Sequence, residues 1–243
     1  IKNYFGKLNT FYFTLVEGIK DPYRFFKDYI MAMPHRNVQM SLGSRIHEIA
    51  ELYFRGKLDE GKLEKDELKY LANIKKVNEE LSKRVFRQVA AEEKLNISLN
   101  KLLNCSDDLT FTGKIDAIYA KENLYLIVDF KTDKSTDYNT DHRRQLAAYK
   151  RLYSIAKNAE QGSISTAIAY IGLAGKINTG RLDYSIAYEK EGSDKILWAN
   201  FLKQMQLLLA YKSDPIKFIE ALLAQDKNEL LFEIVKRELG RQS

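Results

Sequence analysis

The alternation of apolar and polar positions predicts a β-hairpin near the middle of the chain. Residues 109–119 are rich in β-branched and aromatic side chains and partly alternate, and residues 124–128 form a continuous apolar run. Only Lys121-Glu122-Asn123, a short polar connection, separates the two, as in an antiparallel hairpin. A turn centred between Glu122 and Asn123 sets Asp116 opposite Asp129, whereas a three-residue turn would shift this register by one.

The other periodic segments predict further strands and helices around this hairpin. We expect strands at 89–99, 163–171 and 182–188, the last at a sheet edge; helices at 41–54, 141–153, 189–211, 215–224 and 227–239; a helical N-terminal segment at 1–40; and a helical arm at 64–90. The pattern predicts an α/β fold in which a central mixed β-sheet is flanked by helices.

Charged residues end the second strand of the hairpin. Side chains alternate along a strand, so Asp129 and Lys131 point to one side and Phe130 to the other. Opposed residues of a hairpin project to the same face, with Cβ atoms roughly 4.5–5.5 Å apart. Two carboxylates at Asp116 and Asp129 would repel one another unless a proton or cation lay between them, and a hard divalent cation suits oxygen ligands. The same acid-x-Lys spacing at Glu92 and Lys94 is interpreted as surface charge.

Two predicted helices carry further polar candidates. His47, on helix 41–54, offers a third ligand, although an isolated histidine is more often structural. Gln145 and Tyr149 lie one turn apart on helix 141–153 and share a face, where a solvated amide and a core aromatic are the simplest interpretation. His35 and His142 are assigned no role.

Together these residues form an ordered series: Gly43-x-x-x-His47, Gly113-x-x-Asp116, Asp129-x-Lys131 and Gln145-x-x-x-Tyr149. The series resembles the PD-(D/E)XK nuclease superfamily, specifically its RecB-type branch, over about residues 43–153. That branch includes the nuclease domains of RecBCD and AddAB helicase–nucleases and RecB-type CRISPR-associated exonucleases. The third motif carries Asp where Glu is commoner. The resemblance implies a restriction-endonuclease-like core.

The resemblance also implies roles for the motif residues. His47, Asp116 and Asp129 would bind the metal, with the backbone carbonyl of Phe130 as a fourth ligand. Lys131 would orient or help deprotonate the attacking water and stabilise the charged transition state, while Gln145 and Tyr149 position Lys131 and the substrate phosphate. An imidazole ligand makes Mn²⁺ at least as suitable as Mg²⁺. Some relatives hold an iron–sulfur cluster with four cysteines; this chain has one, Cys105, so no cluster of that kind is expected.

A net charge of +6 and a pI near 9.1 favour a polyanionic partner, here DNA. Arg143, Arg144 and Lys150 flank the Gln145–Tyr149 face and are the candidate phosphate contacts. The pairs Lys75-Lys76 and Lys83-Arg84 are interpreted as solvated helix faces.

At 243 residues and 45% hydrophobic composition, the chain is long enough for a substantial core. We expect one nuclease domain over residues 1–243, with its core at about 41–188 and C-terminal helices at 189–243. No signal peptide or 18-residue apolar stretch is visible, so we expect a soluble, cytoplasmic protein with no membrane contact. The chain begins with Ile1, which makes a longer helicase–nuclease a candidate source and a helicase domain or subunit a candidate partner.

The expected function is metal-dependent hydrolysis of DNA phosphodiester bonds by an exonuclease acting on ends or single strands, in DNA repair or recombination. An alternative is a nuclease-like domain that binds DNA or a partner subunit without cutting; the intact Asp116, Asp129 and Lys131 weigh against it. A hydrolase of small phosphate esters is a third class, disfavoured because the bases are spread out and no Gly-rich phosphate loop is present.

Overall fold

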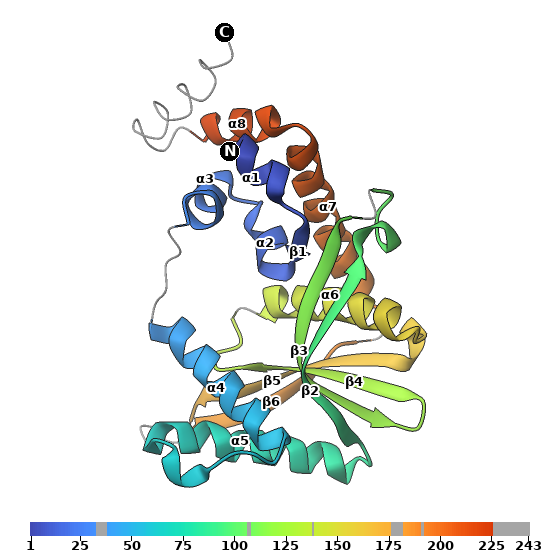
Figure 1. Ribbon diagram of the computed structural model, residues 1–243. Helices are drawn as coiled ribbons and strands as arrows, with labels where there is room; N and C mark the ends of the chain where they lie inside the picture. The colour runs from blue at the N-terminus through green and yellow to red at the C-terminus, as the bar shows by residue number, and fades with distance from the viewer. Residues whose placement is uncertain (33–37, 106–107, 138, 176–181, 191, 226–243) are drawn as a thin grey trace. The chain divides into compact units, whose positions relative to one another are not determined.

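The computed structural model describes residues 1–32, 38–105, 108–137, 139–175, 182–190 and 192–225. The chain divides into two compact units (Figure 1). The first comprises Ile1–His35, Ser98–Phe111 and Ala199–Ser243, and the second comprises Arg36–Ile97 and Thr112–Trp198. All four motifs lie in the second unit, while a single domain over the whole chain stays a prediction.

The first unit consists of short helices around an aromatic core. Its elements are α1 (Lys2–Lys7), β1 (Thr10–Tyr12), α2 (Phe13–Gly18), α3 (Pro22–Phe25), the π-helix η1 (Phe26–Ile30), the 3₁₀ turn η3 (Leu99–Lys101) and α8 (Pro215–Leu223). The Phe218 ring lies 5.2 Å from that of Phe5 and 5.7 Å from that of Phe25, centroid to centroid. The Asp214 carboxylate accepts a hydrogen bond from the Ile216 backbone N–H and caps α8 at its predicted start. The predicted helix 227–239 lies outside the described residues.

The second unit is built on a mixed sheet, as predicted. Strands β3 (Thr110–Lys121), β4 (Leu124–Lys131), β5 (Ile164–Ala174) and β6 (Leu182–Tyr188) follow one another in that order, and β2 (Arg87–Ser98) pairs with β3. Strands β4 and β5 are parallel, whereas the β3–β4 and β5–β6 pairs are antiparallel. β6 is the edge strand that the sequence pattern predicts.

The hairpin register agrees with the prediction. Lys121 pairs with Leu124 and Ala117 pairs with Val128, so the intervening turn has two residues. Glu122, the first of these, adopts a left-handed conformation with φ 52°, as tight hairpin turns require. Continued by one position, this register sets Asp116 against Asp129.

Helices cover both faces of this sheet (Figure 1). Helices α4 (Val38–Phe54) and α5 (Lys65–Lys83) lie on one face, and α6 (Asn139–Lys157) lies on the other. The apolar core between the sheet and α4 and α5 includes Phe130, whose ring stacks on that of Phe54 at 5.9 Å. Phe130 therefore points to the opposite face from Asp129 and Lys131, as the alternation predicts.

Two helix boundaries differ by five residues or more from the predicted ones. Helix α5 ends at Lys83, so a helical arm reaching residue 90 is wrong: Val85 adopts a left-handed φ of 66°, and residues 87–90 belong to β2. Helix α7 (Asp194–Ser213) begins five residues later than predicted, after the left-handed Gly192.

The 3₁₀ turns η2 (Glu60–Lys62) and η4 (Gln161–Ser163) complete the described elements. Within the described ranges, no helix combines the length and apolar character needed to span a membrane.

Candidate active site

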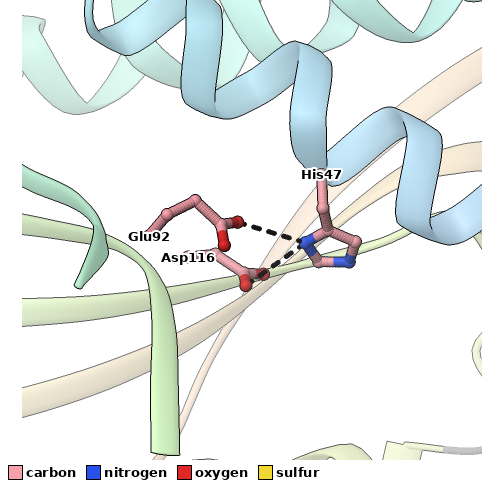
Figure 2. A group of neighbouring side chains, drawn as sticks. All are labelled: His47, Glu92 and Asp116. Atoms are coloured by element: carbon pink, nitrogen blue, oxygen red, sulfur yellow. Dashed lines mark ion pairs between the residues drawn. The ribbon is translucent and has the colours of Figure 1, made fainter. Parts of the chain in front are cut away.

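One imidazole and two carboxylates converge from three elements (Figure 2). His47 extends from α4, Glu92 from β2 and Asp116 from β3. His47 Nδ1 lies 3.2 Å from Asp116 Oδ1 and 3.7 Å from Glu92 Oε1. One potential ligand atom from each residue falls within 4.8 Å of the other two, the spacing of a cation site.

Glu92 is the member of this cluster that sequence reasoning missed. Its interpretation as surface charge is wrong, because the residue is only 6% exposed. Glu92 has a left-handed φ of 52° within β2, an uncommon conformation for a residue other than glycine and one that interrupts the regular alternation of the strand. The only available signal was an acid pair, Glu92-Glu93, in the middle of a predicted strand.

Asp116 also links the two hairpin strands. Its second oxygen, Oδ2, accepts a hydrogen bond from the Phe130 backbone N–H at 2.7 Å. This bond fixes the Asp116 carboxylate beside the Asp129-Phe130-Lys131 segment. Phe130 thus contributes a donor that orients one of the acids, while its carbonyl as a metal ligand stays a prediction.

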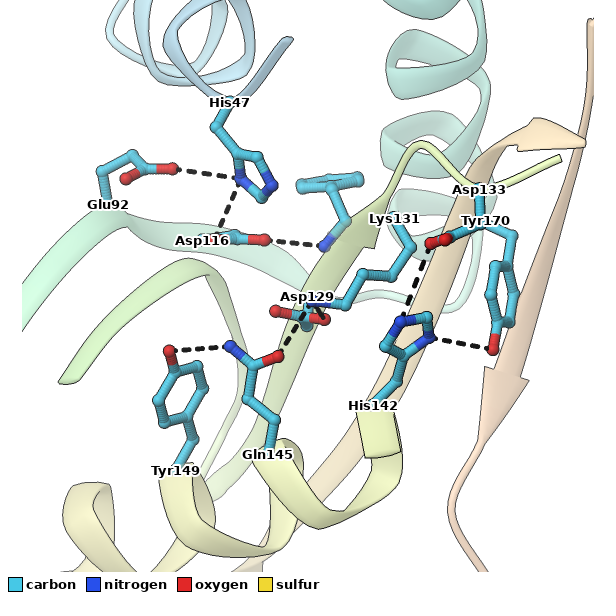
Figure 3. Close-up of polar contacts among 11 residues, drawn as sticks. His47, Glu92, Asp116, Asp129, Lys131, Asp133, His142, Gln145, Tyr149 and Tyr170 are labelled. Carbon is cyan, nitrogen blue, oxygen red and sulfur yellow. Dashed lines mark hydrogen bonds and ion pairs between the residues drawn. The ribbon is translucent and has the colours of Figure 1, made fainter. Parts of the chain in front are cut away.

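Asp129 and Lys131 belong to a second group of polar contacts (Figure 3). Lys131 Nζ lies 2.7 Å from Asp129 Oδ2 and donates a hydrogen bond of 2.9 Å to Gln145 Oε1. The Gln145 amide nitrogen in turn donates to the Tyr149 hydroxyl at 2.9 Å. The structure therefore brings together four predicted site residues: Asp129, Lys131, Gln145 and Tyr149. Asp129 is not part of the cluster of His47, Glu92 and Asp116.

The charges in this region perturb one another strongly. Burial raises the pKa of the Asp129 carboxyl to about 6, despite the opposing effect of Lys131. Burial lowers the pKa of the His47 imidazole, but Asp116, Glu92 and Asp129 outweigh it and raise that pKa to about 10. Burial also lowers the pKa of Lys131, and Asp129 and Asp116 outweigh it and raise the pKa above its usual value. Lys131 is therefore an ammonium at neutral pH.

The donor set fits a divalent cation. Among the described residues, three buried carboxylate oxygens of this region have no hydrogen-bond partner: both oxygens of Glu92 and Oδ2 of Asp129. Lys114 forms an ion pair with Glu92, and Lys131 forms one with Asp129. Buried carboxylates without hydrogen bonds are costly, and a cation offsets that cost. One imidazole nitrogen with two or three carboxylates suits Mn²⁺ well and also accommodates Mg²⁺.

Comparison with known proteins identifies the family. Residues 19–237 match the family model described as PD-(D/E)XK nuclease superfamily. The chain belongs to the PD-(D/E)XK nuclease superfamily.

Two solved structures are similar to this chain. The structure named "Putative exonuclease" from Eubacterium rectale is 13% identical, with a TM-score of 0.53, covering 87% of this chain and 84% of that one. The structure of SSO0001 is 16% identical, with a TM-score of 0.42, covering 86% of this chain and 78% of that one. No curated protein matches the sequence.

In this member of the superfamily, the glycine of the Gly113-x-x-Asp116 motif has a packing role. A Cβ atom at Gly113 would lie 2.7 Å from Leu152 Cδ2 and 2.9 Å from Tyr149 Cε1. Both contacts come from α6, so the missing side chain lets that helix pack directly on β3. Gly113 thereby leaves room for the ring of Tyr149, whose hydroxyl accepts the hydrogen bond from Gln145.

The three bases predicted to contact phosphate each pair with a carboxylate. Arg143 forms a bidentate ion pair with Glu189: its Nε lies 2.6 Å from Oε2 and its Nη2 lies 2.5 Å from Oε1. Arg144 pairs with Asp141 at 3.0 Å, and Lys150 Nζ lies 3.4 Å from the buried Asp194. Their role in phosphate binding stays a prediction.

Proposed function

We propose that this chain is a divalent-metal-dependent deoxyribonuclease that removes nucleotides from DNA ends or single strands. Membership in the nuclease superfamily supports phosphodiester hydrolysis. The structural neighbour from Eubacterium rectale is named "Putative exonuclease", and we propose exonuclease activity here. DNA repair or recombination in the cytoplasm, with a helicase domain or subunit as partner, is the setting that we propose from the family resemblance.

The observation that carries this proposal is the position of Lys131. Its ammonium lies between the Asp129 carboxylate and the Gln145 amide oxygen, at 2.7 and 2.9 Å. The hairpin register, continued by one position beyond the Ala117–Val128 pair, sets Asp129 opposite Asp116. Asp116 in turn contacts His47. A fixed cationic side chain next to a cluster of metal-binding type suits phosphodiester hydrolysis, because the side chain and a bound cation can both stabilise negative charge on the phosphate.

Each residue then has a defined task. His47, Glu92 and Asp116 would hold a divalent cation, and Asp129 is a further candidate ligand. Such a cation, when bound, polarises a phosphate oxygen and lowers the pKa of water. Lys131 would stabilise the negative charge that develops on the phosphate, and the Gln145 hydrogen bond holds Lys131 in place for this.

Cleavage of labelled DNA tests the proposal. End-labelled single-stranded and double-stranded DNA is incubated with the purified chain in Mn²⁺, Mg²⁺ or EDTA. We expect release of short products from the ends in Mn²⁺ or Mg²⁺ and no release in EDTA. DNA binding without cleavage under every condition would instead favour a nuclease-like binding domain, and hydrolysis of small phosphate esters alone would favour an unrelated hydrolase.

A further inference from the structure

Three polar side chains form a second cluster beside Lys131 (Figure 3). Asp133 follows β4, His142 lies in the first turns of α6, and Tyr170 lies on β5. His142 Nδ1 is 3.3 Å from the Tyr170 hydroxyl, and His142 Nε2 is 3.7 Å from Asp133 Oδ2. The sequence patterns assigned no role to any of these residues.

This cluster is built into the elements that hold Lys131. Tyr170 is the register partner of Lys131 across the parallel β4–β5 pair, so the two side chains project to the same face. His142 and Gln145 lie three positions apart on α6 and share its sheet-facing side. Gln145 contacts Lys131 itself, and His142 approaches Asp133, two residues further along the chain.

The protonation state of the cluster follows from its surroundings. Burial raises the pKa of Tyr170 to about 12, with Asp133 and Asp129 adding to the effect, so its hydroxyl keeps its proton. That hydroxyl can donate to Nδ1 of a neutral His142, which places the imidazole proton on Nε2, toward Asp133.

Four charged or titratable groups act on His142. Burial lowers the pKa of the imidazole, and the positive charge of Lys131 lowers it further, whereas Asp133 and Asp141 oppose this; the pKa lies below its usual value. Tyr170 is the remaining neighbour and stays uncharged. His142 is therefore neutral at pH 7 and gains a proton only under acidic conditions.

The charge of Asp133 acts on both basic side chains, Lys131 and His142. Its charge contributes to the raised pKa of Lys131, after the larger effects of burial, Asp129 and Asp116, and it also acts on His142. A neutral imidazole leaves the charge of the Asp133 carboxylate uncompensated, so that it acts on Lys131. A protonated imidazole pairs with that carboxylate and repels the Lys131 ammonium.

We propose that His142 is a positioning residue for Lys131 in the nuclease reaction, acting through Asp133. The neutral imidazole leaves the negative charge of Asp133 acting on the Lys131 ammonium, and protonation of the imidazole offsets that charge, repels Lys131 and lowers activity at acidic pH. This inference rests on the proposed function, because it concerns the rate of DNA cleavage.

The pH dependence of cleavage distinguishes this role from a structural one. His142→Gln retains an amide that can face Asp133 but cannot take up a proton. We expect the cleavage rate of His142→Gln at pH 8 to be roughly fivefold lower than that of the unmodified chain. We also expect the cleavage rate of this variant to begin to fall at a lower pH, and to fall less steeply, than that of the unmodified chain. Tyr170→Phe, which leaves the imidazole in place, should keep the steeper decline. A His142→Gln profile with an unchanged acidic decline, or one lowered equally at every pH, would overturn the inference.

A titration without metal or substrate separates this inference from the proposed function. The chain has three histidines, so the NMR signals of His142 can be assigned by their loss in His142→Gln. Asp133→Asn should lower the pKa of His142 and Lys131→Gln should raise it. An unmoved His142 pKa in both variants would overturn the role of His142 alone. Absence of cleavage by the unmodified chain in any metal would instead overturn the proposed function.

Discussion

Asp129→Asn and Lys131→Ala should each lower the rate of metal-dependent DNA cleavage by on the order of 10³-fold. Asp129 is almost fully buried, and Lys131 is its ion-pair partner at 2.7 Å, so each variant removes one half of a fixed pair. The loss of Lys131 removes the ammonium that would stabilise charge on the phosphate. The loss of the Asp129 carboxylate leaves that ammonium without its closest counter-charge. Single-turnover cleavage of end-labelled DNA in Mn²⁺ measures both effects.

Lys134→Ala is the matched control for these variants. Lys134 has the same charge as Lys131, lies three residues later and is exposed. Its removal should change the rate by less than a few-fold, because an exposed charge contributes little when salt and water screen it. Cleavage by Lys131→Ala at the rate of Lys134→Ala would contradict the central role of Lys131, provided that circular dichroism shows both variants folded.

Gly172→Ala should destabilise the protein by about 3 kcal/mol or more. A Cβ atom at Gly172 would lie 2.3 Å from the Thr132 carbonyl oxygen and 3.0 Å from Tyr70 Cε1. The backbone at Thr132 cannot yield as a flexible side chain would, because it directly follows Lys131 at the end of β4. The substitution therefore forces β5 and the segment after Lys131 apart. Urea unfolding measures the free energy of unfolding.

Gly43→Ala provides the comparison for Gly172→Ala. A Cβ atom at Gly43 would meet Thr132 Oγ1 at 3.7 Å, an ordinary contact. Gly43 lies inside α4, where alanine is favoured over glycine by roughly 0.5–1 kcal/mol. We expect equal or greater stability for Gly43→Ala. Equal stabilities of Gly172→Ala and the unmodified chain would show that β5 and Thr132 do not pack as closely as the structure has them.

The sequence predicted most of the sheet because local rules determine it. The two-residue turn after Lys121 fixes the hairpin register, and this register, continued by one position beyond the Ala117–Val128 pair, sets Asp116 against Asp129. Period-two alternation then places Asp129 and Lys131 on one face and Phe130 in the apolar core. Both inferences depend only on residues that are close together in the sequence, so they can be made without the tertiary structure.

Glu92 could not be predicted because its position depends on a backbone exception. Regular alternation says nothing of a residue with φ 52° inside a strand, and an acid in a polar sequence context is usually exposed. The ion pairs formed by Arg143 and Lys150 could not be predicted from the sequence either. Their partners, Glu189 and Asp194, lie more than forty residues away along the chain and approach α6 only through the tertiary fold.

Calorimetric titration of Mn²⁺ into the metal-free chain most directly tests whether His47, Glu92 and Asp116 form one cation site. We expect one bound cation, an affinity that His47→Ala and Asp116→Asn each weaken by roughly 100-fold, and no such loss in Asp59→Asn, an exposed acid. Because the pKa of His47 is raised to about 10, binding at neutral pH should release a proton, and the affinity should increase as the pH rises toward that value. Unchanged affinity in both His47→Ala and Asp116→Asn would contradict the existence of this site.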